Sequence, residues 1–194
     1  GTNTDNNLVF GTGWSYGAEF FLKKRTGRIN GWIGYTWSKT ERQFEELNNG
    51  DIFPAKFDRR NDLSLVIDYT LNEKWRFGGV FVYATGNSIS LPIQRYMVEG
   101  RITDLFGSRN GYRMADYHRA DISATFTPKK KEKNKNKKTE NSWVFSVYNI
   151  YNRANPYFLF FDTEGLLSEG TLQIQAKQIS LFPILPSFTW NFKF

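Results

Sequence analysis

The sequence predicts an all-β fold, a transmembrane antiparallel β-barrel of which this chain supplies about seven strands. Three observations lead to this prediction. The last stretch, SFTWNFKF, alternates aromatic and polar residues, which indicates a strand with one apolar and one polar face. No apolar run approaches the roughly 18 residues of a membrane-spanning helix, although aromatic residues make up 18% of the chain. Finally, the predicted strands are joined by connections that are alternately short and long.

The last strand has an apolar face too large for a water-exposed surface. Phe188, Trp190, Phe192 and Phe194 share that face, and four adjacent aromatic side chains would promote aggregation in water. A bilayer outside and a wet lumen inside would accommodate both faces of the strand. The chain ends on Phe194, and this ending resembles the C-terminal signal strand of bacterial outer-membrane β-barrels, which the barrel-assembly machinery recognises. The edge strand of a soluble β-sandwich is the alternative interpretation.

Seven segments carry the strand pattern. They are residues 14–24, 29–39, 61–71, 75–85, 116–127, 142–151 and about 179–194. The first two flank the tight turn RTGR, in which Gly27 is suited to positive φ. Both faces of 142–151 are apolar, so its outward face stays open. Pro183 and Pro186 place the first half of the last segment at a rim or a bulge, because proline cannot donate to a strand ladder.

The connections between these segments have lengths of about 4, 21, 3, 30, 14 and 27 residues. Outer-membrane barrels alternate in this way, with short periplasmic turns and long extracellular loops. We therefore expect residues 40–60, 86–115 and 152–178 to be extracellular and the C-terminus to be periplasmic. The third long loop contains a possible small hairpin, YFLFFDTEG followed by TLQIQAKQ.

An odd number of strands argues against a finished barrel, because bacterial single-chain barrels use even numbers. Unpaired strand edges in lipid leave backbone groups unsatisfied. We therefore expect residues 1–194 to be the C-terminal part of a larger barrel domain, with the edges of its first and last strands occupied. The occupant is either the rest of the same receptor or the barrel-assembly machinery, which would pair with the last strand by β-augmentation.

The charge of the chain is concentrated in one tract. The net charge is +7, and Lys129–Lys138 holds seven Lys and one Glu. Residues 128–141 are expected to form a Lys-rich periplasmic turn that is either solvated or in contact with the phosphates of the inner leaflet. The start of the chain lacks a signal-peptide pattern, so the chain is expected to be mature or truncated. Cysteine is absent, which leaves no thiolate metal site.

Five runs resemble the C-terminal barrel region of TonB-dependent outer-membrane receptors, with the Bacteroidetes-type members as the best match. They are WSYGAEFFLKKRTGRINGWIGYTWSKTERQF, FPAKFDRRNDLSL, VYATGNSISLPIQRY, YNRANPYF and QAKQISLFPILPSFTWNFKF. The resemblance implies a 22-stranded barrel with an N-terminal plug that takes up scarce ligands with energy from the TonB system. It also implies outer-membrane lipids, the plug and remaining strands, and a surface lipoprotein as partners. No ligand site is carried over, and neither the ligand nor the lipoprotein follows from the sequence.

Site chemistry is sparse. His118 is the only histidine, and a barrel hydrolase would need it close to a serine such as Ser123 and to an acid, so we expect no catalytic, metal or cofactor site. The Lys tract has few aromatics and is not expected to bind nucleic acid. Asp58, Arg59, Arg60 and Asp62 are expected to form a charge ladder at the lumen or rim, or else to contact an anionic ligand. Aromatic residues in the long loops leave a soluble β-sandwich lectin as a further alternative.

Overall fold

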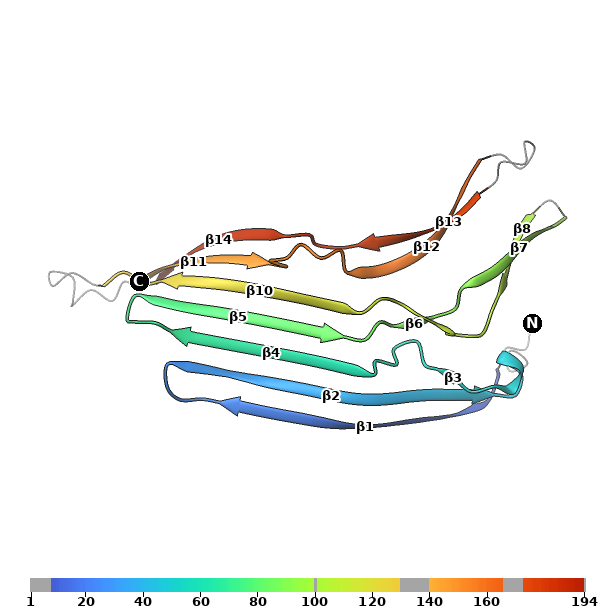
Figure 1. The fold of residues 1–194 in the computed structure, drawn as a ribbon, viewed down its shortest axis with the longest axis horizontal. Coiled ribbons are helices and arrows are strands. Elements are labelled where there is room, and N and C mark those ends of the chain that lie inside the picture. The colour runs from blue at the N-terminus through green and yellow to red at the C-terminus, as the bar shows by residue number, and fades with distance from the viewer. Residues whose placement is uncertain (1–7, 100, 130–139, 166–172, 194) are drawn as a thin grey trace, which may run out of the picture. The chain divides into compact units, whose positions relative to one another are not determined.

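The computed structural model describes residues 8–99, 101–129, 140–165 and 173–193 (Figure 1). These residues form an all-β fold of antiparallel strands, with a single 3-10 turn at Asn48–Gly50 and no α-helix among them. The strands are β1 (Gly11–Lys24), β2 (Ile29–Phe44), β3 (Phe53–Pro54), β4 (Asn61–Thr70), β5 (Trp75–Ala84), β6 (Ser88–Ile89), β7 (Pro92–Val98), β8 (Arg101–Phe106), β9 (Tyr112–Arg113), β10 (Tyr117–Phe126), β11 (Glu140–Tyr148), β12 (Pro156–Glu164), β13 (Gln173–Ser180) and β14 (Leu185–Lys193).

The main sheet follows the order of the sequence. Its hydrogen-bonded path is β1-β2-β4-β5-β10-β11-β14, and β3 pairs beside β2. The seven strands of this path are the seven that the sequence predicts, and the short strand β3, which was not predicted, makes the sheet eight-stranded. Strands β1 and β14 are its terminal members, and no closed barrel is formed by the residues that the structure describes.

Some expected boundaries were wrong. The last strand begins at Leu185 and not near residue 179, because Pro183 interrupts the chain between β13 and β14. The 30-residue connection at 86–115 is not structureless: it contains the pairs β6-β9 and β7-β8. The hairpin expected in the third long connection is confirmed as β12-β13. Lys130–Lys138 lie outside the described residues.

The chain divides into two compact units, which are described separately. Unit 1 comprises residues 1–19, 35–62 and 84–115, and unit 2 comprises residues 20–34, 63–83 and 116–194. Unit 1 holds the long connections after β2 and β5. Unit 2 holds the short connections, the strand segments next to them, and the third long connection with β12 and β13.

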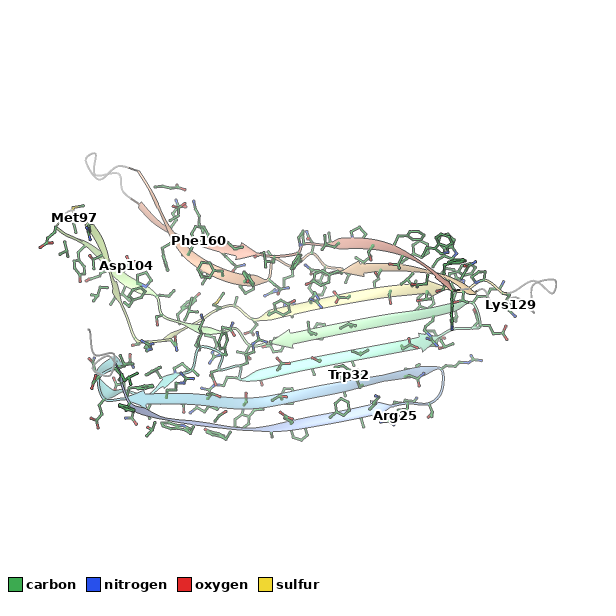
Figure 2. All side chains as sticks on the ribbon, turned by 180° about the vertical axis from the view of Figure 1, so that it is seen from behind. Arg25, Trp32, Met97, Asp104, Lys129 and Phe160 are labelled. Atoms are coloured by element: carbon green, nitrogen blue, oxygen red, sulfur yellow. The ribbon has the colours of Figure 1, made fainter. Side chains whose placement is uncertain are left out.

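The short connections of unit 2 lie at one end of its strands (Figure 1). Gly27 has φ +93°, as its place in the turn predicts. In the turn between β4 and β5, the Asn72 carboxamide oxygen accepts the N–H groups of Lys74 and Trp75 at 2.8 and 3.0 Å. The Thr127 N–H donates to the Lys74 carbonyl at 2.8 Å, which joins the next strand to the same end. Figure 2 shows Lys129 at this end as well.

Candidate functional site

The first candidate site is the aromatic face that unit 2 presents along β11 and β14. Trp143 is the register partner of Trp190, and Phe145 is the partner of Phe188. Their ring centroids are 5.7 and 5.0 Å apart, respectively. Partners in an antiparallel ladder point to the same side of the sheet. This register assigns the face of β11 that the sequence leaves open: Trp143 and Phe145 share the aromatic side of β14.

Two further strands extend this aromatic belt, which we define as Trp75, Phe77, Phe126, Trp143, Phe145, Phe188, Trp190 and Phe192. Phe126 of β10 is the register partner of Trp143. The Phe126 ring lies 4.9 Å from that of Trp75, which in turn stacks on Phe77 at 6.1 Å. Trp190 remains 57% exposed within this belt, so neighbouring rings cover only part of it. Phe194 lies outside the described residues.

Large apolar side chains also stand exposed on the other strands of unit 2. Phe20, Leu22, Ile29, Ile33, Ile67, Leu71 and Ile122 are each at least 39% exposed. Together with the aromatic belt they form what we call the apolar face. A patch of this extent is uncommon on a soluble monomer and is typical of a surface that contacts lipid or another protein.

The opposite face of unit 2 is polar. The Ser146 and Ser187 hydroxyls lie 2.7 Å apart, and Arg76 pairs with Asp68 at 3.4 Å. A hollow of about 350 Å³ is lined on this part of the sheet by Gly78, Ser123 and other residues of β4, β5, β10 and β11. A Cβ atom on Gly78 would lie 2.6 Å from the Ser123 hydroxyl oxygen, so a larger residue there would require that hydroxyl to rotate away.

One aromatic pair breaks the polar character of that face. Phe21 and Trp32 lie one position out of phase with the apolar residues of their strands, and their rings pack at 5.8 Å. Gly34 lies beside the pair, and a Cβ there would be in ordinary contact with it, at 3.5 Å from Trp32 and 3.6 Å from Phe21. The two rings therefore cover each other while Phe21 stays 68% exposed.

The second candidate site is a buried carboxylate in unit 1. The Asp58 side chain is 0% exposed and pairs with Arg60 at 2.8 Å and with Arg113 at 2.6 Å. It also accepts the Thr40 N–H at 2.6 Å. Burial alone raises the pKa of Asp58, but the Thr40 N–H and the two guanidinium groups outweigh it and hold that pKa below its usual value.

Arg113 joins this carboxylate to the backbone of two connections. Its guanidinium donates to the Asp58 carbonyl at 2.6 Å and to the Gly86 carbonyl at 2.9 Å. The Arg113 side chain thus uses its fork geometry to fix the start of β4 against the start of the connection after β5. Sequence reasoning missed Arg113, which is 55 residues from Asp58 and lies in no recognisable pattern with it.

The four predicted charged residues form two separate pairs. Asp58 pairs with Arg60, whereas Arg59 pairs with Asp62 at 3.5 Å and donates to the Asn87 carboxamide at 3.4 Å. The pair of Arg59 and Asp62 is about half exposed, so solvent screens it. Lining of a lumen or rim by these residues stays a prediction.

A third cluster surrounds Asp121 in unit 2. Arg119 pairs with Asp121 at 2.9 Å, and its guanidinium lies 4.0 Å from the ring centre of Tyr148. The Tyr117 hydroxyl accepts a hydrogen bond from Arg119 at 3.0 Å. The other Asp121 oxygen accepts the Asn149 N–H at 2.9 Å, which connects this cluster to the end of β11.

Asparagine side chains hold the segment YNIYNRANPYF at that end. Asn149 is 1% exposed, and its carboxamide donates to the carbonyls of Arg153 and Phe182 at 3.0 and 3.2 Å. Asn155 is 5% exposed and pairs with both backbone groups of His118, at 3.0 and 2.9 Å. These amides replace the hydrogen bonds that the chain loses where it leaves the ladder. Asn149 and Asn155 therefore have a structural role, and we call these two side chains the asparagine bracket.

The structure does not bring His118 and Ser123 together. Its Nδ1 lies 2.9 Å from the Tyr151 hydroxyl. Ser123 is an odd number of positions away on β10, so strand alternation places it on the other face of the sheet. No group of three or more His, Cys, Asp or Glu residues suited to a metal ion occurs among the residues that the structure describes.

Comparison with known proteins gave no match: no family model, no curated protein and no solved structure is similar to this chain. Within the described ranges, no helix has the length and apolar character needed to cross a membrane.

Proposed function

We propose that this chain is the C-terminal barrel segment of a TonB-dependent outer-membrane receptor that takes up a ligand. The observation that carries the proposal is the exposed apolar face of unit 2, opposite a polar face of serine, glycine and paired charges. A barrel strand in a bilayer needs this alternation, with apolar side chains toward lipid and polar ones toward the lumen. The receptor family rests on the resemblance of the five sequence runs.

The aromatic belt supports an interfacial position for one end of the sheet. Trp75 follows the short turn after β4, and Trp143 and Trp190 are register partners. Indole rings favour the boundary between headgroups and acyl chains. We propose that this end is periplasmic and that the long connections are extracellular, which also makes the Lys-rich segment 128–141 periplasmic. The lipids of the outer membrane are then the partner of the apolar face.

The terminal strands β1 and β14 supply the second line of support. A sheet that ends in lipid needs a partner for each edge, because no water replaces the missing backbone hydrogen bonds. The remaining strands of the receptor would occupy both edges, with its plug inside and the TonB system acting through the plug. During insertion, the barrel-assembly machinery would pair with β14 instead.

The test uses spin labels at Trp190 and Asn191 of the protein reconstituted in lipid vesicles. Trp190 belongs to the aromatic belt, and Asn191 donates to Ser142 at 3.4 Å on the other face. We expect a label at position 190 to be accessible to oxygen and one at position 191 to be accessible to a water-soluble relaxation agent. A label at Ser187 should resemble that at 191, and one at Phe188 should resemble that at 190.

Two results would reject the membrane assignment. One is equal water accessibility at positions 190 and 191. The other is a monodisperse monomer in detergent-free buffer whose electrophoretic mobility does not change on heating, which would favour the soluble sandwich. Protease added to intact cells tests the orientation, since we expect cleavage in 40–60, 86–115 or 152–178 and protection of the Lys tract.

A further inference from the structure

Two adjoining hollows in unit 1 share one arginine. The first has a volume of about 430 Å³ and is lined by Leu47, Phe106, Arg109 and polar side chains. The second has a volume of about 530 Å³ and is lined by Arg109, Asp51 and the segment around Phe53. Both lie within the range of small-molecule sites. Neither hollow contains a residue of the Asp58 cluster.

Arg109 is positioned by a backbone hydrogen bond and by a cation–π contact of its side chain. Its backbone N–H donates to the Asn48 carboxamide oxygen at 2.8 Å. Its guanidinium carbon lies 5.9 Å from the ring centre of Phe53, a side chain that is only 3% exposed. Among the residues that the structure describes, no acceptor or acidic side chain is bonded to this guanidinium. Its fork of N–H donors is therefore available to a ligand.

The backbone around Arg109 is also fixed. Asn110 donates its N–H to the Ser90 hydroxyl and its carboxamide to the Pro54 carbonyl, both at 2.9 Å. Asn48 and Asn110 both have φ above +50°, the left-handed conformation that asparagine tolerates. These bonds join three separate stretches of chain around the first hollow. A site held in this way loses little conformational entropy when it binds a ligand.

The two hollows differ in charge. Among the described residues, Arg109 is the only charged one that lines the first hollow, whereas Asp51 also lines the second. An anion would be attracted to the first hollow and repelled from the Asp51 side. The Ser90 hydroxyl accepts from Asn110, so its own O–H remains a donor for a ligand there. Leu47 and the 55% exposed Phe106 supply an apolar wall.

We propose that the first hollow binds a carboxylate attached to a ring or an apolar group, with Arg109 as its bidentate partner. A single guanidinium matches the charge of one carboxylate, while a phosphate dianion would remain half neutralised. The carboxylate belongs to an acidic sugar or to the C-terminus of a peptide, two sources with the same chemistry. The inference goes beyond the proposed transport role and does not depend on it, because the pocket is built within unit 1.

Isothermal titration with four probes tests the proposal on the purified protein. The sugar probes are sodium D-galacturonate and neutral D-galactose, and the peptide probes are N-acetyl-leucyl-leucine and its C-terminal amide. We expect at least one acid to bind at least about tenfold more tightly than its neutral counterpart. Galacturonate preference identifies a sugar, peptide-acid preference identifies a peptide terminus, and either result supports the carboxylate site. Equal binding of acid and neutral probes, or tighter binding of inorganic phosphate, would overturn it.

Substitution at Arg109 localises the binding. Arg109→Gln should weaken binding of the preferred acid by about tenfold or more, whereas Arg109→Lys keeps the charge and should lose less. Arg101→Gln is the matched control, since Arg101 is an exposed arginine that does not line the hollow and its loss changes the net charge equally. Circular dichroism of each variant checks the β-fold. Unchanged affinity in folded Arg109→Gln, or an equal loss in Arg101→Gln, would reject the site.

Discussion

Unit 1 and unit 2 differ in which side chains they bury. The buried residues of unit 1 lie in its connections and at strand ends, and they mix apolar Phe53, Ala55 and Met114 with polar Asp58 and Ser88. In unit 2, the buried side chains of the described residues are the amides Asn149 and Asn155, while Phe188, Trp190 and Phe192 stand more than half exposed. Unit 1 therefore has a small core of its own, and unit 2 does not.

The two units differ because their backbone polar groups are satisfied in different ways. Irregular backbone must satisfy its polar groups with side chains, so unit 1 uses Arg113 and Asp58 where no ladder is available. The ladders of unit 2 satisfy the backbone themselves, so its side chains are free to match the surroundings of each face. An exposed apolar face is unfavourable in water and favourable in a bilayer.

The largest effect is expected in unit 1, from Asp58→Ala. This change leaves Arg60, Arg113 and the Thr40 N–H without their shared acceptor, and breaking a buried pair in this way costs about 3–5 kcal/mol. The measurement is the free energy of unfolding from a denaturant titration. Asp62→Ala is the control, because its pair with Arg59 is exposed and should change stability by about 1 kcal/mol or less.

At low pH, the free energies of unfolding of wild type and Asp58→Asn should become equal. The pKa of Asp58 is lower in the folded protein than in the unfolded chain, so ionisation stabilises the fold above the unfolded pKa of about 3.9. That stabilisation is lost as the pH falls from about 4 through the folded pKa. Unfolding titrations at pH 7 and below pH 3 check this. A wild-type advantage that persists unchanged in strong acid would contradict the role of the ionised carboxylate.

In unit 2, a charge on the apolar face should be costly only in lipid. Ile122 is 46% exposed in the middle of β10, and Ile122→Lys should cost about 2–4 kcal/mol in a bilayer if the site lies near the midplane. Ser123→Lys is the control on the polar face and should cost much less. Reversible unfolding in vesicles measures both. Equal costs for the two variants would mean that the two faces of β10 see the same solvent.

The sequence was sufficient for the parts of the fold that depend on local periodicity. Alternation along SFTWNFKF and the Gly27 turn predicted the strands of unit 2, because both signals lie within a few residues. The hairpin of β7 and β8 was missed, because Glu-Gly is not among the usual two-residue turn pairs such as Asn-Gly, although Glu99 adopts φ +49°. The pairing of Asp58 with Arg113 could not be predicted from the sequence, since a contact over 55 residues is set by tertiary structure alone.

The asparagine bracket combines features of both regions, because it holds irregular backbone within unit 2. Asn149→Ala removes bonds to the carbonyls of Arg153 and Phe182, and it also places alanine at φ +53°. We expect a loss of about 1–3 kcal/mol. Asn149→Gly permits the left-handed backbone and removes only the side chain, so the difference between the two variants measures the strain. If Asn149→Ala and Asn149→Gly were both as stable as wild type, the Asn149 side chain would contribute nothing to the stability of the fold.

The smallest effect concerns Phe21 and Trp32, the aromatic pair on the polar face of unit 2. Neighbouring Phe20 and Phe21 are 64% and 68% exposed, yet strand alternation points them to opposite faces. If the polar face contacts water, the Phe21 ring is stabilised by its contact with Trp32 and not by contact with lipid. A double-mutant cycle of Phe21→Ala and Trp32→Ala should then give a coupling of about 0.5–1.5 kcal/mol, with the same value in detergent and in vesicles.

The control is Phe20→Ala. Its effect on stability should depend on the lipid environment, because the Phe20 ring belongs to the apolar face. A vanishing coupling between Phe21 and Trp32, together with greater lipid contact for a label at 21 than for one at 20, would reverse the assignment of faces on β1.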